Sequence, residues 1–204
     1  MKKLLIATHN AGKVAEFRRI LGDLGLEIAS AGELALPAPE EDGETFSENA
    51  IKKALAAAFA SGEMTLADDS GLEVDALNGA PGVHSARYAG DQGSVANMQK
   101  LLDALESVPE GNRSARFRCV LALVDPKGPL GDEVLLTEGR CEGAIARAPR
   151  GAGGFGYDPI FVPEGGDRTM SEISDAEKDE ISHRGEACAA MRVKIAEYLR
   201  VRVQ

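Results

Sequence analysis

The sequence has little cysteine, no excess of basic charge and no long apolar run, and each shortage argues against a class of protein. Cys119, Cys141 and Cys188 are its only cysteines among 204 residues. Because they are odd in number and widely spaced, they indicate neither a disulfide framework nor a cysteine-based zinc site. Lys and Arg total 23 against 33 Asp and Glu, a net charge of −10. A nucleic-acid polymer or an anionic membrane is therefore not expected as the main partner.

The apolar run near the N-terminus extends only over residues 4–7. This is too short for a signal peptide or a membrane span. Cysteines in apolar surroundings are typical of structural thiols in a reducing compartment, so we expect a cytoplasmic protein. Hydrophobic residues make up 44% of the chain, and no repeat or low-complexity linker divides it. We expect one domain over residues 1–204 with a substantial core.

Two adjacent aspartates, Asp68 and Asp69, follow an apolar segment. Residues 60–67 predict a turn and a short buried strand, which residues 68–71 should interrupt before an alternating pattern resumes at residues 72–75. Neighbouring side chains on a strand point to opposite faces, so one carboxylate can bind a cation or orient water while the other braces the backbone. The alternative is an Asx turn with a solvated pair of aspartates.

A strand, a tight turn and a helix are predicted near the N-terminus. Residues 3–7 form an apolar strand, residues 8–13 a turn of small residues, and apolar residues then recur at helical spacing from Val14 to Leu24. Such a helix start offers unpaired N–H groups and the positive end of the helix dipole, and Lys13 adds a mobile charge, so the segment suits a phosphate group. It is only half of a P-loop, since Val14 follows Lys13. An ordinary capped helix with an exposed lysine is the alternative.

A glycine-rich segment at residues 150–159 contains the spacing G-x-G-x-x-G. We do not interpret it as a dinucleotide-binding fingerprint, because that motif needs a strand before it and a helix after it. Here prolines flank the segment, and a short apolar strand at residues 160–162 follows. A flexible loop is expected instead, presenting Phe155, Tyr157 and Asp158 where the backbone can approach a ligand closely. A surface Ω-loop without a ligand is the alternative.

Charged residues at 177–180 lead to Ser182, His183 and Arg184 at the start of a last helix. This position suits an anion or side chains that read a ligand, although a helix cap with charged neighbours is the alternative. Ser70, His183 and an aspartate could also suggest a hydrolase triad. No serine lies in a G-x-S-x-G elbow, however, so we reject a triad.

The remaining pattern predicts a mixed α/β fold. A capping box at residues 45–48 opens an alanine-rich helix over residues 50–60. A second amphipathic helix is expected over residues 97–105. Two long strands, 115–124 and 133–146, are expected to pair across a tight turn. We therefore expect a long, bent, mixed central β-sheet flanked by helices.

Five segments of the chain form a pattern that is specific in its order and distances. They are THNAGK at 8–13, EEDGETFSENA at 40–50, ADDSGLEVDALNGAPGVHSARYAG at 67–90, GGFGYDPIF at 153–161 and EKDEISHRGEA at 177–187. Together they resemble the Ham1/RdgB family of inosine triphosphate pyrophosphatases. The resemblance implies a homodimeric α/β protein of two lobes, with the active-site cleft between them. It also implies Mg²⁺-dependent hydrolysis of the non-canonical purine nucleoside triphosphates ITP, dITP and XTP to monophosphate and pyrophosphate.

The resemblance also implies roles for the residues that match the family's motifs. Asp69 would accept a proton and bind the metal ion, together with either Glu40 or Glu41. The triphosphate would contact the turn before the first helix, at Thr8, His9, Asn10, Ala11, Gly12 and Lys13. Ser70 would touch the substrate, and base and sugar would be held by Phe155, Gly156, Tyr157, Asp158, Lys178, His183 and Arg184. His9 departs from the glycine that many relatives have there.

Two other functions fit part of the pattern. A Maf-type pyrophosphatase shares the broad architecture, but the segments at 153–161 and 182–184 argue against it. A nucleotide sensor without catalysis needs a phosphate turn and a base pocket but has no use for the acidic cluster of Glu40, Glu41, Asp68 and Asp69. We therefore favour an enzyme whose partner is a small-molecule purine nucleoside triphosphate and whose cofactor is Mg²⁺, with no nucleic acid or membrane involved.

Overall fold

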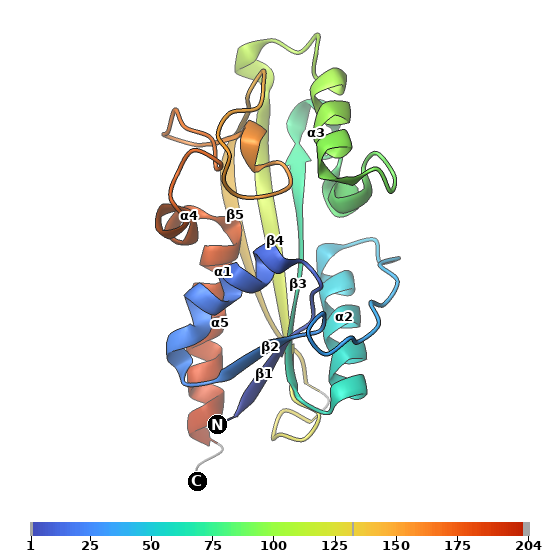
Figure 1. The fold of residues 1–204 in the computed structure, drawn as a ribbon, viewed down its shortest axis with the longest axis vertical. Coiled ribbons are helices and arrows are strands. Elements are labelled where there is room, and N and C mark those ends of the chain that lie inside the picture. Colours follow the sequence, from blue (N-terminus) through green and yellow to red (C-terminus); the bar gives the residue numbers. More distant parts are fainter. Residues whose placement is uncertain (1, 132, 202–204) are drawn as a thin grey trace. The chain divides into compact units, whose positions relative to one another are not determined.

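The structure, a computed structural model, describes residues 2–131 and 133–201. Within them the chain forms a mixed six-stranded sheet in the order β2-β1-β3-β4-β5-β6, with helices packed on it (Figure 1). The strands are β1 (Lys3–Ile6), β2 (Glu27–Ser30), β3 (Met64–Val74), β4 (Ser114–Val124), β5 (Leu135–Ile145) and β6 (Phe161–Pro163). The helices are α1 (Ala11–Leu21), α2 (Phe46–Ser61), α3 (Gly93–Ala104), α4 (Asp175–Ile181) and α5 (His183–Val201). Short 3₁₀ turns lie at Gly22–Leu24, Asp75–Leu77, Gly82–Arg87, Glu110–Asn112 and Asp158–Ile160.

The pairing of the strands confirms the predicted α/β class with a mixed central sheet. Strand β1 is parallel to both β2 and β3, whereas β5 and β6 are antiparallel. Strands β4 and β5 are neighbours, as the sequence predicts for a pair joined by a tight turn.

The chain divides into two compact units that share the three long strands. The first unit contains residues 1–69, 119–139 and 185–204, and the second contains residues 70–118 and 140–184. Strands β3, β4 and β5 therefore each contribute one part to either unit. One domain over residues 1–204 and an active-site cleft between two lobes stay predictions.

The core of the first unit contains apolar side chains of its strands and of helices α1 and α5. On α1, Phe17 and Leu21 are one turn apart and fully buried, as the helical spacing predicts. The buried cluster consists of Leu4, Ile6, Phe17, Leu21, Leu26, Met64, Leu66, Cys119, Leu121, Leu123, Ala187, Cys188, Met191, Ile195 and Tyr198. Its two cysteines are buried in this cluster and form no disulfide.

The second unit has a separate core. Helix α3 contributes Leu101, and Leu105 follows directly after the helix. The buried cluster consists of Leu72, Val74, Leu101, Leu105, Ala115, Phe117, Cys141, Ile145, Tyr157, Ile160, Phe161 and Met170. Tyr157, which the sequence places in the glycine-rich loop, therefore belongs to this core.

Strand β3 is continuous from Met64 to Val74. The expectation that residues 68–71 interrupt it is therefore wrong, and so is the alternative of an Asx turn. Asp68 and Asp69 are both buried within the strand. Buried carboxylates need compensation, and each of these two faces the ammonium group of a lysine. This pairing explains why two acidic residues can continue a buried strand.

Both helices predicted for the middle of the chain are confirmed. Helices α2 and α3 each begin four residues before the predicted start, and α2 has the predicted capping box. Strand β2 and helix α4 were not predicted, because each buries a single residue and so lacks an apolar pattern. Among residues 2–131 and 133–201, no helix combines the length and the apolar character that a membrane crossing requires.

Candidate active site

The two aspartates of β3 each face a lysine from a helix of the first unit. Asp68 Oδ2 lies 2.8 Å from Nζ of Lys13 in α1. Asp69 Oδ1 lies 2.6 Å from Nζ of Lys53 in α2, and the same ammonium group lies 2.8 Å from Oε1 of Glu41. Adjacent residues of a strand point to opposite faces, so the two aspartates reach different helices. The acidic cluster is thus held by ion pairs, in which Asp68 and Asp69 are buried and Glu41 is partly exposed.

The predicted phosphate turn is the capped start of α1. Asn10 is the N-cap residue, and its Oδ1 accepts hydrogen bonds from the N–H groups of Gly12 at 2.9 Å and Lys13 at 3.2 Å. Thr8 Oγ1 in turn accepts a hydrogen bond from Asn10 N–H at 3.2 Å. The expectation of unpaired N–H groups is therefore wrong for Gly12 and Lys13, because the Asn10 side chain satisfies both.

Two side chains of this segment are also held by other groups. Lys13 is not the exposed lysine of the alternative interpretation, because Asp68 binds its ammonium group and 17% of the side chain is exposed. His9 Nε2 donates a hydrogen bond to the carbonyl oxygen of Leu36 at 2.8 Å. Ala11 is exposed. A phosphate group that binds Lys13 would compete with Asp68 for it.

The pKa values of Asp69 and Lys53 are both raised, by burial in the first case and by neighbouring charges in the second. Burial raises the pKa of Asp69 above the ordinary aspartate value, against the opposing charge of Lys53. Burial lowers the pKa of Lys53, but the charges of Asp68, Asp69 and Glu41 together raise it above the ordinary lysine value. Lys53 therefore stays protonated, while Asp69 binds a proton more tightly than a solvated carboxylate does. Tighter proton binding makes Asp69 a stronger general base.

Of the two candidate metal ligands before α2, Glu41 contacts Lys53 and Glu40 is exposed. The described part of the chain contains no group of three His, Cys, Asp or Glu side chains placed to hold a metal ion. Glu41 and Asp69 nevertheless direct carboxylate oxygens at one cationic atom, and Mg²⁺ prefers oxygen ligands of this kind. The donor chemistry of this pair fits a hard divalent cation.

Two members of the group, Lys53 and Asn49, were not predicted from the sequence. Asn49 Nδ2 donates a hydrogen bond to Asp69 Oδ2 at 3.3 Å. Both residues lie on the buried face of α2, which otherwise carries an aromatic residue and alanines: Phe46, Ala50, Ala54, Ala57 and Ala58. A lysine and an asparagine on the alanine face of a helix are the signal that could have identified them, because buried polar groups need partners.

In the second unit, a buried ion pair links α4 to the glycine-rich loop. Asp158 Oδ2 accepts hydrogen bonds from Lys178 Nζ at 2.7 Å and from Phe155 N–H at 2.8 Å. Both charged side chains are 5% exposed. The Lys178 ammonium group also lies 4.7 Å from the centroid of the Phe155 ring. The ion pair therefore fixes the position of Phe155 through both its backbone and its ring.

The loop does not present all the side chains that the sequence suggests. The Tyr157 hydroxyl donates a hydrogen bond to the carbonyl oxygen of Ser85 at 2.9 Å, inside the second unit. Tyr157 and Asp158 are both buried, whereas Phe155 and Gly156 are half-buried. The expectation of a flexible loop that presents Tyr157 and Asp158 is therefore wrong, and Phe155 is the side chain that remains accessible.

The glycine spacing of the loop follows from packing. Gly151 and Gly154 have φ angles of +81° and +69°, which favour glycine. A Cβ atom on Gly151 would lie 2.5 Å from the backbone of Ser171, and one on Gly154 would overlap the Asp158 carboxylate. Within G-x-G-x-x-G itself, a Cβ atom on Gly153 would lie 3.1 Å from the Ser171 carbonyl oxygen, and Gly156 has a φ angle of +64°. Local packing and backbone conformation therefore account for the three glycines of this spacing without a dinucleotide.

Ser182 lies between the last residue of α4 and His183, the first residue of α5. Both residues therefore lie at the start of a helix, as predicted. Arg184 is buried, its Nη2 donates a hydrogen bond to Ser70 Oγ at 3.3 Å, and its guanidinium group lies 5.8 Å from the centroid of the Phe155 ring. The His183 ring stacks on Phe117, with centroids 4.7 Å apart and planes 13° apart. Asp158, Lys178 and Arg184 thus surround Phe155 in the second unit, whereas the His183 ring contacts Phe117.

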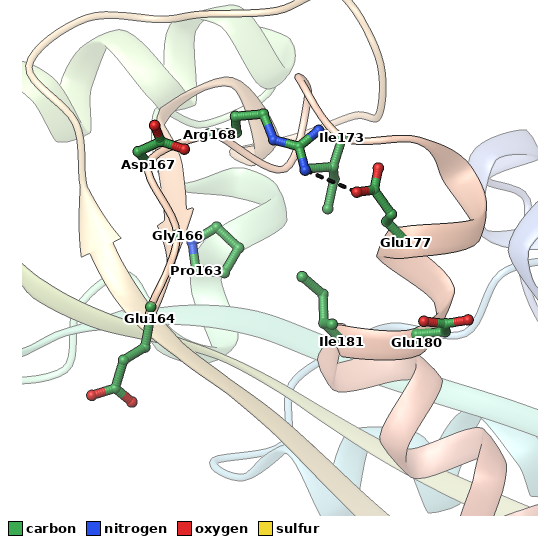
Figure 2. A pocket seen from close by; sticks show the side chains of 10 residues that line it. Pro163, Glu164, Gly166, Asp167, Arg168, Ile173, Glu177, Glu180 and Ile181 are labelled. Atoms are coloured by element: carbon green, nitrogen blue, oxygen red, sulfur yellow. Dashed lines mark hydrogen bonds and ion pairs between the residues drawn. The ribbon is translucent and has the colours of Figure 1, made fainter.

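A pocket of the second unit has a different lining. Figure 2 shows it between α4 and the segment after β6, with a volume of about 440 Å³. Arg168 Nη2 donates a hydrogen bond to Glu177 Oε1 there at 2.8 Å. The lining consists of Pro163, Glu164, Gly165, Gly166, Asp167, Arg168, Ile173, Glu177, Glu180 and Ile181. It includes no residue for which the sequence predicts a catalytic or binding role.

The model of the Ham1 family matches residues 4–194. The chain belongs to the Ham1 family. The match spans all five segments from which the sequence resemblance was drawn, so the resemblance is confirmed.

Relatives of this Ham1 family member are similar over nearly their whole length. A dITP/XTP pyrophosphatase from Desulforamulus reducens is 52% identical over 187 residues, which are 91% of each chain. A dITP/XTP pyrophosphatase from Bacillus subtilis is 50% identical over 189 residues, 92% of this chain and 93% of the relative. The structure of a HAM1 protein from Coxiella burnetii is 44% identical, with a TM-score of 0.85 over 97% of this chain and 100% of that one. The similarity therefore extends over both units.

Proposed function

We propose that this protein hydrolyses the non-canonical purine nucleoside triphosphates dITP, ITP and XTP to the monophosphate and pyrophosphate, and so removes them from the nucleotide pool. Relatives that are 52% and 50% identical carry the name dITP/XTP pyrophosphatase. The observation that carries the proposal is the convergence of Asp69 and Glu41 on Lys53, at 2.6 and 2.8 Å. Hydrolysis of a phosphoanhydride needs a base for the attacking water and cations for the phosphates, and this group offers both.

Mg²⁺ is the proposed cofactor, with Asp69 and Glu41 as its ligands. Their carboxylate oxygens suit a hard cation. Glu41, unlike the exposed Glu40, lies beside Lys53 together with Asp69, which supports it as the second ligand. When bound, Mg²⁺ would neutralise phosphate charge and polarise the anhydride that is cleaved.

Asp69 is the proposed proton acceptor for the water that attacks the α-phosphorus, with pyrophosphate as the leaving group. Its raised pKa supports this role, because a base works best when its pKa is closer to the working pH. Lys13 would neutralise charge on the outer phosphates after leaving Asp68. Lys53 would keep Asp69 ionised and in place before the proton is taken up.

The start of α1 is proposed to lie along the triphosphate. The positive end of the helix dipole and the charge of Lys13 support this placement. Contacts are proposed from Thr8, His9, Asn10, Ala11, Gly12 and Lys13. Because the Asn10 side chain holds two N–H groups, we propose that its role is to keep this turn rigid as well as to meet a phosphate oxygen.

The second unit is proposed to bind the base and the sugar. Phe155 offers a ring face for stacking, and Arg184 is a donor-only group suited to the oxygen at position 6 of hypoxanthine or xanthine. Tyr157 and Asp158 are proposed to act by holding Phe155 in place. The other proposed contacts come from Ser70, Gly156, Lys178 and His183.

We also propose a homodimer that works in the cytoplasm on a small-molecule substrate, without a nucleic acid or a membrane. The support for the dimer is the family resemblance. The support for the location is the composition, with its buried cysteines that form no disulfide. Light scattering coupled to size-exclusion chromatography tests the dimer, which should give a single species of twice the chain mass.

One assay tests the proposed function. The protein is incubated with dITP, XTP, ITP, GTP or ATP and Mg²⁺, and the products are identified as pyrophosphate or phosphate. Release of pyrophosphate and monophosphate from dITP, XTP and ITP, with GTP and ATP much slower, is the expected result. Binding without turnover would show a nucleotide sensor, and a preference for other nucleotides would point to a Maf-type activity.

A further inference from the structure

Asn49 is a buried polar residue of the first unit that contacts both Gly43, in the segment that carries Glu41, and the carboxylate of Asp69. Its Oδ1 accepts a hydrogen bond from Gly43 N–H at 2.9 Å, and its Nδ2 donates to the carbonyl oxygen of Gly43 at 3.4 Å. Nδ2 also donates to Asp69 Oδ2 at 3.3 Å. The reverse orientation of the amide would place Oδ1 against a carboxylate and a carbonyl group, so these partners determine which end is the donor.

Asn49 and Lys53 are four residues apart on α2 and therefore lie one above the other on the same face. Lys53 binds Oδ1 of Asp69 and Asn49 binds Oδ2. One helix face thus holds both oxygens of the carboxylate. Lys53 also binds Glu41, and Gly43, two residues further along, is bound to Asn49.

Gly43 has no room for a side chain because of this contact. A Cβ atom added to Gly43 would lie 2.7 Å from Asn49 Oδ1. Any residue other than glycine would therefore displace the Asn49 amide or the segment that carries Glu41. Asn49, like Lys53, therefore links the acidic segment to Asp69.

We propose that Asn49 is a positioning residue that sets the plane of the Asp69 carboxylate and holds the Glu41 segment, so that both acidic groups face the same cation. This inference rests on the proposed function, since it assigns Asn49 a role in that reaction. Hydrogen-bond partners of metal-binding carboxylates typically affect metal affinity or activity by about 10–100-fold.

Three variants separate positioning from folding. Asn49→Ala removes all the hydrogen bonds of the side chain. Asn49→Asp keeps the acceptor for Gly43 N–H but turns a carboxylate oxygen toward Asp69. Asn97→Ala is the matched control, because Asn97 is a buried asparagine on α3 that anchors a loop in the same way, accepting from Ala89 N–H at 2.6 Å and donating to the carbonyl oxygen of Ala86 at 2.9 Å.

Each variant is compared with the natural protein by melting temperature, by kcat and KM for dITP at saturating Mg²⁺, and by Mn²⁺ binding to the protein alone in electron paramagnetic resonance. Asn49→Ala should lower kcat by about 10–100-fold and weaken Mn²⁺ binding by about 10-fold, with KM changed much less. Asn49→Asp should also be slow yet bind Mn²⁺ at least as tightly as the natural protein, because it adds a carboxylate. Asn97→Ala should lower only the melting temperature.

The inference is wrong if folded Asn49→Ala turns over dITP at a near-normal rate, or if it loses no more kcat and Mn²⁺ affinity than Asn97→Ala. If Asn49→Ala does not fold, Gly43→Ala replaces it, since the added Cβ displaces the amide without removing it, and the same changes are expected. If the natural protein releases no pyrophosphate from dITP or XTP, the proposed function fails instead. The Mn²⁺ comparison then decides the role of Asn49 by itself.

Discussion

The ammonium group of Lys53 lies between two carboxylates, 2.6 Å from Asp69 Oδ1 and 2.8 Å from Glu41 Oε1. One buried cation therefore balances two acidic groups that would otherwise repel each other. Removing one partner of a buried ion pair leaves an uncompensated charge, which destabilises a protein by about 3–5 kcal/mol. The ammonium group of Lys53 thus compensates the charges of both Asp69 and Glu41.

Replacement of this lysine should make stability depend on a divalent cation. Lys53→Met should lower the free energy of unfolding in metal-free buffer by less than about 3–5 kcal/mol, since 31% of the Glu41 side chain is exposed and water screens part of the repulsion. Mg²⁺ should restore part of the loss. Calorimetric melting with and without Mg²⁺ measures both effects.

Lys52→Met is the matched control for this prediction. Lys52 is the neighbouring lysine, pairs with Asp42 at the surface and has 41% of its side chain exposed. Its replacement should change stability by less than about 1 kcal/mol. A Lys53→Met melting temperature that does not respond to Mg²⁺ would contradict the assignment of Asp69 and Glu41 as a cation-binding pair.

Replacement of the proposed base should separate activity from stability. Asp69→Asn should lower turnover by about 10²–10⁴-fold, the usual range for a positioned base. Burial raises the pKa of Asp69, so the folded protein binds a proton at this carboxylate more tightly than the unfolded chain does. Stability therefore falls as pH rises through the pKa that Asp69 has in the folded protein. Ionisation of Asp69 therefore opposes folding at neutral pH, and Lys53 keeps Glu41 as a partner in Asp69→Asn, so the melting temperature at pH 7 should fall less than in Lys53→Met.

Steady-state kinetics and calorimetry on the same Asp69→Asn preparation check both parts. Asp42→Asn serves as the control, because Asp42 is an exposed acidic residue of the segment that carries Glu41. A folded Asp69→Asn protein with near-normal turnover would refute the role of Asp69.

Much of the fold follows from apolar spacing in the sequence, but the course of β3 does not. Helices α2 and α3 and strands β4 and β5 carry apolar patterns strong enough to predict them. The pair Asp68 and Asp69 looks like a strand breaker when only neighbours in the sequence are considered. Its partners, Lys13 and Lys53, lie 55 and 16 residues away along the chain, and no local pattern contains that information.

The candidate site, like the fold, could be predicted only in part from the sequence. Motif resemblance predicts the residues that carry charge or an aromatic ring, and the structure groups most of them. It does not show which side chains face inward, so Tyr157 was expected at the surface of a loop and lies in a core. Asn49 and Lys53 were missed because they belong to a helix whose alanine content indicates packing only.

Acid should weaken the start of α4 through Glu177. Arg168 and the Ser174 backbone N–H donate hydrogen bonds to its carboxylate at 2.8 and 2.9 Å, and they lower the pKa of Glu177 to about 2. A carboxylate with a depressed pKa contributes stability that is present above its unfolded value of 4.5 and is lost as pH falls toward 2. The melting difference between the natural protein and Glu177→Gln should therefore be constant above about pH 4.5 and vanish near pH 2.

The difference should be small and should shrink with added salt, because Glu177 is exposed. Melting curves over this pH range at two salt concentrations measure it. Glu180→Gln, which removes the same charge from α4, is the control. A difference that persists unchanged at pH 2 would mean that Glu177 acts through packing.

The last prediction concerns the choice of base, and it follows from Arg184 as a donor-only group in the second unit. Hypoxanthine and xanthine present an oxygen acceptor at position 6, whereas adenine presents an amino donor that would face the guanidinium group. A site built around such a hydrogen bond can discriminate by roughly four to five decades.

Arg184→Ala should therefore remove most of the activity on ITP and narrow the ratio of ITP to ATP turnover. Guanine keeps the oxygen, so the ratio of ITP to GTP turnover should change much less. Values of kcat/KM for the three nucleotides test this, with the exposed Arg168→Ala as the control. Because Arg184 lies 5.8 Å from the Phe155 ring centroid, a mutant that keeps its full preference for ITP over ATP would place base reading in the Phe155 loop.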